Sequence, residues 1–397
     1  MRTCLASAVL TLAAWFLCPQ QAPPSPEEFL HSQMRLSTNQ VVDIQKGKAV
    51  ARILTSAKRS DIFVFGAVYI HAKPDAYLEL MTDIAKLKKM PGYLGAGKFS
   101  EPPQISDMEG FSLDQNDIED LKKCRPGDCG LQLPEESMEA ARNSIDWAAP
   151  DVVEQTNNRA ERGMVRLLGA YQQDGDRALG TYQDKPDPLP VAEQFASLLS
   201  KVEFFPQYLP ELNRFLRDYP NSRPYGTHDF FYWEKVNFGL KPTIRLNHAV
   251  VYRPSGPGQV AYVFAVKQLY ASHYFQAALD LSFCVHDASS SEDQGFYLIT
   301  VKASRQAGLT GLKGGLIRKV ATGKTRSSLE RALNSLRNTL EHPVKSKAVS
   351  PNRLSRELGR ENGQVQLRTV KTEQCAPQTI LYALVSGKWE TAPPCFE

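Results

Sequence analysis

The stretch that decides the fold is residues 296–341, FYLITVKASRQAGLTGLKGGLIRKVATGKTRSSLERALNSLRNTLE. Its first part, Phe296 to Ser304, is rich in aromatic and β-branched residues, which are typical of a strand. Glycines at 308, 311, 314 and 315 then interrupt the strand pattern. The following apolar residues recur at the spacing of one helix face. They are Leu329, Ala332, Leu333, Leu336 and Leu340. A strand that leads into a long amphipathic helix predicts a sheet that receives this apolar stripe.

Several strand-like segments with short turns between them precede that helix. They are FFYWEKVNF, TIRLNHAVVYR, QVAYVFAVKQL, YASHYFQAALDLSFCV and FYLITVKAS. Short connections between successive strands favour an antiparallel meander. The run from Tyr270 to Val285 would curve strongly if it is one strand. The pattern therefore predicts an α+β fold, in which an antiparallel sheet curves around a long C-terminal helix.

The segments upstream of the meander show a mixed pattern. Residues 26–37 indicate a short helix, 41–55 fit a hairpin with its turn at Lys46-Gly47, and 61–70 form a strand. From about Ser106 to Asp218 the pattern becomes helical, with proline and glycine between the helices. The expected helices include Val152 to Tyr171, Val191 to Phe204 and Leu209 to Leu216. We interpret this region as an all-α subdomain.

The N-terminus has the pattern of a signal peptide. Arg2 is followed by the apolar run Leu5 to Leu17 and then by a polar, proline-rich stretch. The run is shorter than the about 20 residues of a membrane span, so we expect an exported protein, periplasmic or extracellular, without a membrane span in its mature form. Lipidation at Cys18 is a weaker alternative, because Trp15 and Phe16 fit that signal poorly.

The cysteines beyond the signal agree with an oxidising compartment. Cys124 and Cys129 enclose the turn sequence Arg-Pro-Gly-Asp, which predicts a local disulfide. Cys375 and Cys395 flank a strand-like run and are expected to pair as well. Cys284 is left as a buried free thiol.

Charge and motifs exclude several classes of function. A formal charge of +4 over 397 residues gives no support for nucleic-acid binding. The HExxH, GxSxG and paired CxxC signatures are absent, so we predict no metal and no cofactor.

Two segments resemble the START-like helix-grip superfamily (SRPBCC), which includes lipid-transfer domains, polyketide cyclases and aromatase-like proteins. Residues 70–83, IHAKPDAYLELMTD, resemble the strand end, polar turn and first helix of that family. Residues 308–320 and 327–341 resemble its closing helix. The resemblance covers about 40–105 and 222–341, and it implies a hydrophobic ligand bound between sheet and helix.

This resemblance gives the expected domain organisation. A signal peptide at 1–22 precedes the N-terminal part of a START-like domain at 23–105. A helical insertion follows at 106–220, and the main sheet and C-terminal helix occupy 221–342. Residues 343–397 are expected to be a linker and a small β tail closed by a disulfide.

Strand alternation suggests candidate binding residues. In the strands around 244–252 and 271–283, the histidines share the apolar side, which we expect to face the C-terminal helix. The expected ligand-binding residues are His248, Tyr252, His273, Phe275, Leu279, Leu333 and Leu336. Arg245 and Asn247 fall on the other side. A neutral imidazole can orient a ligand or act as an acid or base, but each histidine is more simply a hydrogen-bonded core residue. No catalytic residue is assigned.

Three functions agree with these features. The first is binding of a hydrophobic small molecule or lipid in a cavity between the sheet and the C-terminal helix. The second is an interaction protein that docks a protein partner through 106–220. The third, and least favoured, is a cyclase- or hydratase-like enzyme that uses a cavity histidine, because no substrate is suggested.

Overall fold

The computed structural model describes residues 25–342, except 57, 90–91, 203, 238–240, 256–259, 287–294 and 308–310. Within the last helix, side chains are described from residue 322 onward, apart from residue 324. The predicted signal peptide at 1–22 and the predicted tail at 343–397, with its Cys375–Cys395 pairing, lie outside the described residues. In the described part, no helix has both the length and the apolar character needed to cross a bilayer.

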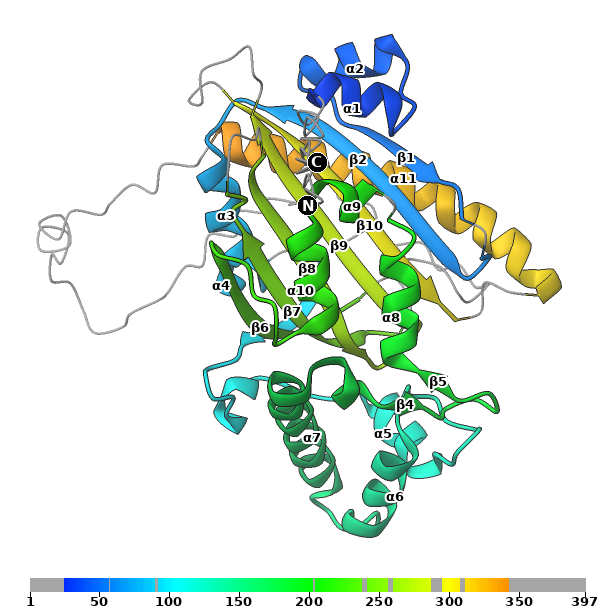
Figure 1. The fold of residues 1–397 in the computed structure, drawn as a ribbon. Helices are drawn as coiled ribbons and strands as arrows, with labels where there is room; N and C mark the ends of the chain where they lie inside the picture. Colours follow the sequence, from blue (N-terminus) through cyan, green and yellow to red (C-terminus); the bar gives the residue numbers. More distant parts are fainter. Residues whose placement is uncertain are drawn as a thin grey trace, which may run out of the picture.

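One eight-stranded antiparallel sheet forms the centre of the molecule, in the order β1-β2-β10-β9-β8-β7-β6-β3 (Figure 1). Strands β6, β7, β8 and β9 each pair with the next strand along the chain, which confirms the predicted meander. The strands are β1 (Val50–Leu54), β2 (Asp61–Ile70), β3 (Tyr93–Lys98), β6 (Thr227–Val236), β7 (Thr243–Tyr252), β8 (Val260–Ala271), β9 (Phe275–His286) and β10 (Phe296–Gln306).

The helix α11 (Gly311–Glu341) crosses one face of this sheet, as the leucine spacing predicts (Figure 1). Its closest approach is to β2, where Gly66 leaves room for it. A Cβ atom at position 66 would lie 2.7 Å from Leu333 Cδ1 and 2.8 Å from Leu329 Cδ2. Two short helices, α3 (Pro74–Thr82) and α4 (Ile84–Leu87), join the same apolar cluster. The leucines of the α11 stripe are 2–9 % exposed; they are Leu329, Leu333, Leu336 and Leu340.

Helices of the middle region cover the opposite face of the sheet (Figure 1). These are α8 (Val191–Leu199), α9 (Phe204–Tyr208) and α10 (Pro210–Asp218). Their apolar sides merge with β7, β8 and β9 in the largest core cluster. The sheet is therefore buried between helices on both faces.

The rest of the middle region lies beyond one end of the sheet (Figure 1). It contains α5 (Gln115–Lys123), α6 (Glu135–Ser144), α7 (Val152–Asp174), the 3-10 segments η1 (Ile105–Met108) and η2 (Gly175–Leu179), and the strands β4 (Thr181–Tyr182) and β5 (Leu189–Pro190). The predicted helices at 152–171, 191–204 and 209–216 are thus present with shifted ends. Cys124 and Cys129 form the predicted local disulfide, with Cα atoms 4.4 Å apart.

Buried ion pairs tie the covering helices to the sheet. Lys267 of β8 is fully buried, pairs with Asp176 of η2 and donates a hydrogen bond of 2.9 Å to the Leu216 carbonyl of α10. Arg305 of β10 contacts Asp61 of β2 at 2.6 Å and also donates a hydrogen bond of 2.6 Å to Gln194 of α8. A charge in an apolar interior is costly unless it is paired, so these contacts fix the helices in place.

The N-terminal hairpin prediction is wrong, because residues 38–45 are helical. Helix α1 (Pro26–Ser32) is followed by α2 (Thr38–Gln45), and only then by the edge strand β1. Ser37 and Gln40 form a capping box at the start of α2, which satisfies free backbone N–H groups. Val41 and Ile44, three residues apart, are its buried face.

The run from Tyr270 to Val285 is two strands, not one. β8 ends at Ala271, and β9 begins at Phe275 after a tight reversal. Tyr274 has a φ of 62°, in the left-handed region that turns use. The apolar character of both flanking segments hides this turn in the sequence.

Truncation of Leu333 to alanine should destabilise the protein by about 2–5 kcal/mol, because Leu333 is buried against Gly66 and the void cannot close fully. Urea unfolding measures this change. The exposed Arg331, on the same helix, gives the control R331A, which should stay within about 0.5 kcal/mol of the parent. Equal effects of the two substitutions would contradict this packing of α11.

Candidate functional site

The strand residues that were expected to face α11 lie on the opposite face of the sheet, and the residues that alternate with them lie beside α11. Leu279 of β9 belongs to the cluster beneath α8 to α10, whereas Asp280 and Ser282 line a cavity beside α11. Arg245 of β7 also lies on the α11 side, so its expected position on the face away from the C-terminal helix is wrong. The reason is that both faces are covered, and the more apolar face packs against the middle helical region.

A cavity of about 130 Å³, here the α11 cavity, lies between the sheet and α11. Charged pairs form part of its lining: Arg245 pairs with Glu234, and Lys302 Nζ lies 2.6 Å from Asp280 Oδ2. Cavities that hold a benzene molecule are of about this size, 150 Å³, and ordinary ligand sites begin near 300 Å³. The apolar lining includes Leu329, Ala332, Leu333 and Leu336.

Three tyrosines add to the polar lining of the α11 cavity. Burial raises the pKa of Tyr77, Tyr93 and Tyr232 above the ordinary value of 10.0, so their hydroxyl groups stay protonated. The nearby Cys284 is a buried free cysteine, as predicted, and burial also raises the pKa of its thiol. An inert, protonated thiol agrees with a packing role.

His248 lies in an aromatic core on the face away from α11. Its Nε2 is 2.8 Å from Asp229 Oδ2, and its Nδ1 is 3.3 Å from the Tyr171 hydroxyl. The rings of Phe231 and Tyr219 are each 4.6 Å from the imidazole, centre to centre. Burial lowers the pKa of His248 below 6.5, although Asp229 opposes this shift. The residue is a hydrogen-bonded core histidine and does not line the α11 cavity.

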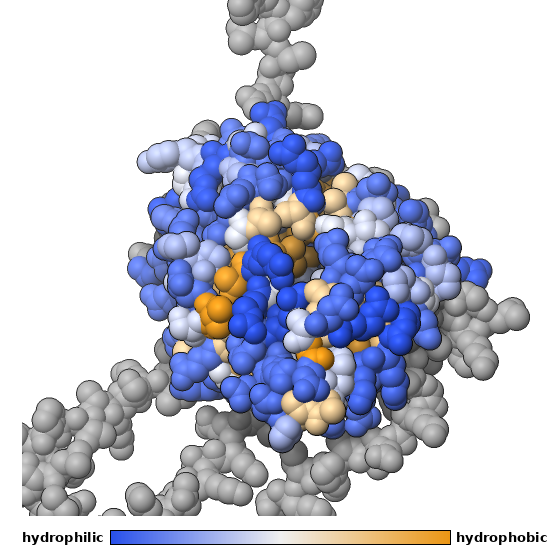
Figure 2. Space-filling view, turned by 90° about the horizontal axis from the view of Figure 1, so that it is seen from below, coloured by the Kyte–Doolittle hydropathy of each residue, from blue (hydrophilic) through white to orange (hydrophobic). Residues whose placement is uncertain are grey.

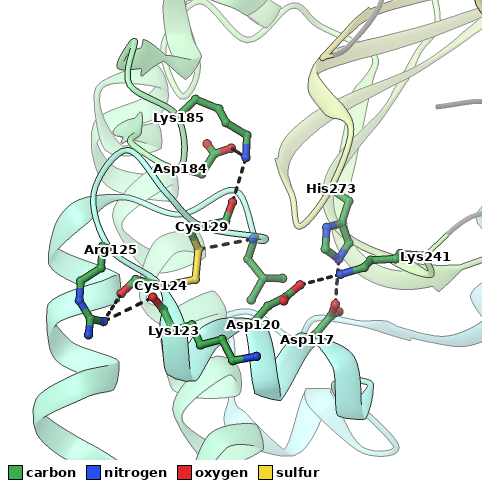
Figure 3. Close-up of a disulfide and its surroundings, with 11 residues drawn as sticks. Asp117, Asp120, Lys123, Cys124, Arg125, Cys129, Asp184, Lys185, Lys241 and His273 are labelled. Atoms are coloured by element: carbon green, nitrogen blue, oxygen red, sulfur yellow. Dashed lines mark hydrogen bonds and ion pairs between the residues drawn. A yellow bond between two sulfur atoms is a disulfide. The ribbon is translucent and has the colours of Figure 1, made fainter. Parts of the chain in front are cut away.

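His273 lies in the turn between β8 and β9, and α5 contacts this turn. Figure 3 shows His273 and Lys241 pointing toward the carboxylates of α5, next to the disulfide. His273 Nε2 is 3.1 Å from Asp117 Oδ1, and Lys241 Nζ is 2.6 Å from Asp120 Oδ2. These contacts join the sheet to the middle helical region.

The remaining predicted residues are separated as well. Tyr252 donates a hydrogen bond of 3.0 Å to Glu211 of α10, away from α11. Phe275 forms a small cluster with Val236 and Ala271 at the end of the sheet. Leu333 and Leu336 do line the α11 cavity. The structure therefore does not assemble the predicted set at one place.

A second and larger cavity, of about 420 Å³, lies among α6, α7 and the end of the sheet. We call it the α6–α7 cavity. Small residues on the two helices leave the space open: Ala140, Ala141, Ala160, Gly163 and Ala170. Larger apolar side chains complete the wall: Phe111, Leu113, Leu121, Leu131, Leu167, Leu179, Ile244 and Tyr270. Its volume falls within the range of small-molecule sites.

Charged residues stand among the lining of the α6–α7 cavity. Arg166 and Glu136 are exposed, while Arg159 is partly buried. Seen from the side of the middle helical region, the surface is mostly hydrophilic, and apolar atoms show within a hollow (Figure 2). Such a site, apolar inside and charged at its margin, suits a ligand with an apolar body.

Sequence reasoning missed the α6–α7 cavity. The available signal was the spacing of Ala160, Gly163, Leu167 and Ala170, which puts small apolar residues on one face of a helix. Such a face also fits close helix packing, so the spacing alone does not predict a void. The cavity depends on how α6, α7 and the sheet end are placed.

Among the described residues, no group of three or more His, Cys, Asp or Glu side chains is arranged to hold a metal ion. No family model matches the chain, and no curated protein matches its sequence. The candidate site is therefore defined by the geometry of this chain itself.

Acidification from pH 7 to 5 should weaken the folded state through His248. The pKa of His248 in the folded protein lies below 6.5, so this histidine binds a proton more readily in the unfolded chain. The free energy of unfolding therefore falls as the pH drops below about 6.5. The slope approaches about 1.4 kcal/mol per pH unit for one proton. Urea unfolding at several pH values measures it, and H248Q should flatten the profile. An unchanged slope in that variant would show that His248 is not the group responsible.

Proposed function

We propose that this protein binds a hydrophobic small molecule, and that the α6–α7 cavity is its binding site. One observation carries the proposal: about 420 Å³ of space enclosed mainly by apolar side chains, several of them alanine or glycine on facing helices. An apolar wall without partner atoms lacks the dispersion contacts that close packing supplies. A ligand with an apolar body restores these contacts and removes its own surface from water.

The site differs from the one expected between the sheet and the C-terminal helix. The α11 cavity is about one third of the size, and paired charges occupy part of its lining. A lipid chain placed there would lie against the Arg245–Glu234 and Lys302–Asp280 pairs. None of these four charged residues lines the larger cavity. The size and the chemistry of the walls therefore both favour the α6–α7 cavity.

The proposal also includes kinship with the START-like superfamily. Its support is the chain order, in which strand β2 leads to α3, the meander β6 to β10 follows, and α11 closes the sheet. We further propose that the protein acts outside the cytoplasm. The Cys124–Cys129 disulfide supports this, because disulfides persist in oxidising compartments.

Filling the cavity tests the proposed binding. Apart from the neighbouring residues and backbone of α7 itself, no described atom lies within 4 Å of a Cβ built at Gly163, so G163L can enter the void without a clash at its first carbon. The variant should lower the affinity for the neutral fluorescent probe Nile red at least about tenfold, since the side chain takes the ligand's volume. Fluorescence titration of the purified protein measures this.

Gly169 provides a matched control on the same helix. It too has no atom within 4 Å of a built Cβ, but it does not line the cavity. Replacing glycine within a helix favours helix formation in both variants, so both should fold. G169L should bind Nile red like the parent. Equal binding by both variants, or no probe binding by the folded parent, would contradict the proposed function.

A further inference from the structure

We infer that the ligand of the α6–α7 cavity is an amphipathic anion, an apolar chain with a carboxylate head, and that Arg159 and Arg166 receive the head. This inference rests on the proposed function and adds the chemical class of the ligand. It starts from Arg159 and Arg166 of α7, which both line the cavity.

The two arginines lie on one side of α7, seven residues apart. Seven residues are two helical turns, or about 10 Å along the axis. Both side chains are long and flexible, so one anionic group placed between them can be reached from either side. Arg162, between them in sequence, does not line the cavity.

In the part of the chain that the structure describes, no carboxylate lies within the 4.0 Å ion-pair limit of Arg159 or Arg166. Glu136 also lines the cavity, but it makes no ion pair with them. The lining of the cavity thus contains two arginines and one glutamate, so the net charge at its margin is positive.

The electrostatic environment of Arg159 adds independent support. Burial lowers the pKa of its guanidinium below the ordinary value of arginine, and the charges of Arg166 and Arg162 lower it further. The guanidinium is partly desolvated and lies near like charges, without a compensating anion. An anionic ligand relieves both conditions, because a charge-assisted hydrogen bond replaces lost hydration and offsets the repulsion.

A carboxylate is the head group that we assign to this margin. Guanidinium groups bind carboxylates with planar, paired hydrogen bonds. The apolar lining of Leu, Phe, Met and Ala side chains then holds the chain, and the anion remains near water at the margin. A neutral chain of the same length keeps the apolar contacts and loses only the head-group contacts.

Titration of the purified protein with decanoate and with 1-decanol, by calorimetry or by displacement of Nile red, tests this inference. The parent should bind decanoate about 10- to 100-fold more tightly than 1-decanol, the range expected for hydrogen bonds to a charged group. The double variant R159Q/R166Q should bring this ratio close to one while its affinity for 1-decanol stays within about twofold.

The control variant R162Q removes a cation from the same helix outside the cavity lining and should keep the parent ratio. Thermal unfolding confirms that each variant is folded. Equal affinity of the parent for both probes, or a ratio that R159Q/R166Q leaves unchanged, would overturn the assignment of an anion while leaving hydrophobic binding in place. Failure of both probes to bind the folded parent would remove the proposed function as well.

Discussion

Burial of the sheet on both faces forces the charged residues of its central strands to find partners inside the protein. On the α11 side, Arg245 pairs with Glu234 and Lys302 pairs with Asp280. On the opposite side Lys267 reaches Asp176 of the middle helical region. Removing one member of such a pair leaves an uncompensated buried charge, which costs about 3–5 kcal/mol. The covering helices and the strands are therefore fixed to each other by paired charges in addition to apolar packing.

The same constraint explains where space remains in the protein. Beneath α11 the charged pairs and tyrosines occupy much of the room that an apolar guest would need, and about 130 Å³ is left. Beyond the end of the sheet, α6 and α7 face each other with alanine and glycine, and about 420 Å³ stays open. Side-chain volume and charge thus separate a small cavity with paired charges in its lining from a larger and more apolar one, although both belong to one continuous fold.

The sequence predicted those features that depend on neighbouring residues. The leucine spacing from 329 to 340 identified α11, and the turn sequence between Cys124 and Cys129 identified the disulfide. Which face of β9 meets α11 was not predictable in this way. Alternation separates Leu279 from Asp280, but it does not say which covering layer each one meets. Similarly, Val41 and Ile44 fit either a strand or a helix, and the capping box at Ser37 decides between them.

The pairing of β2 with β10 has a consequence for how the chain reaches its folded state. Asp61 lies opposite Arg305, so the hydrogen bonds of this ladder join residues about 240 positions apart. Contacts so distant in sequence form late, since a long loop must close before they contribute. Until residues up to 306 are available, β2 has an open edge that invites pairing with another chain. The newly made chain therefore exposes this edge of β2 until synthesis has passed residue 306.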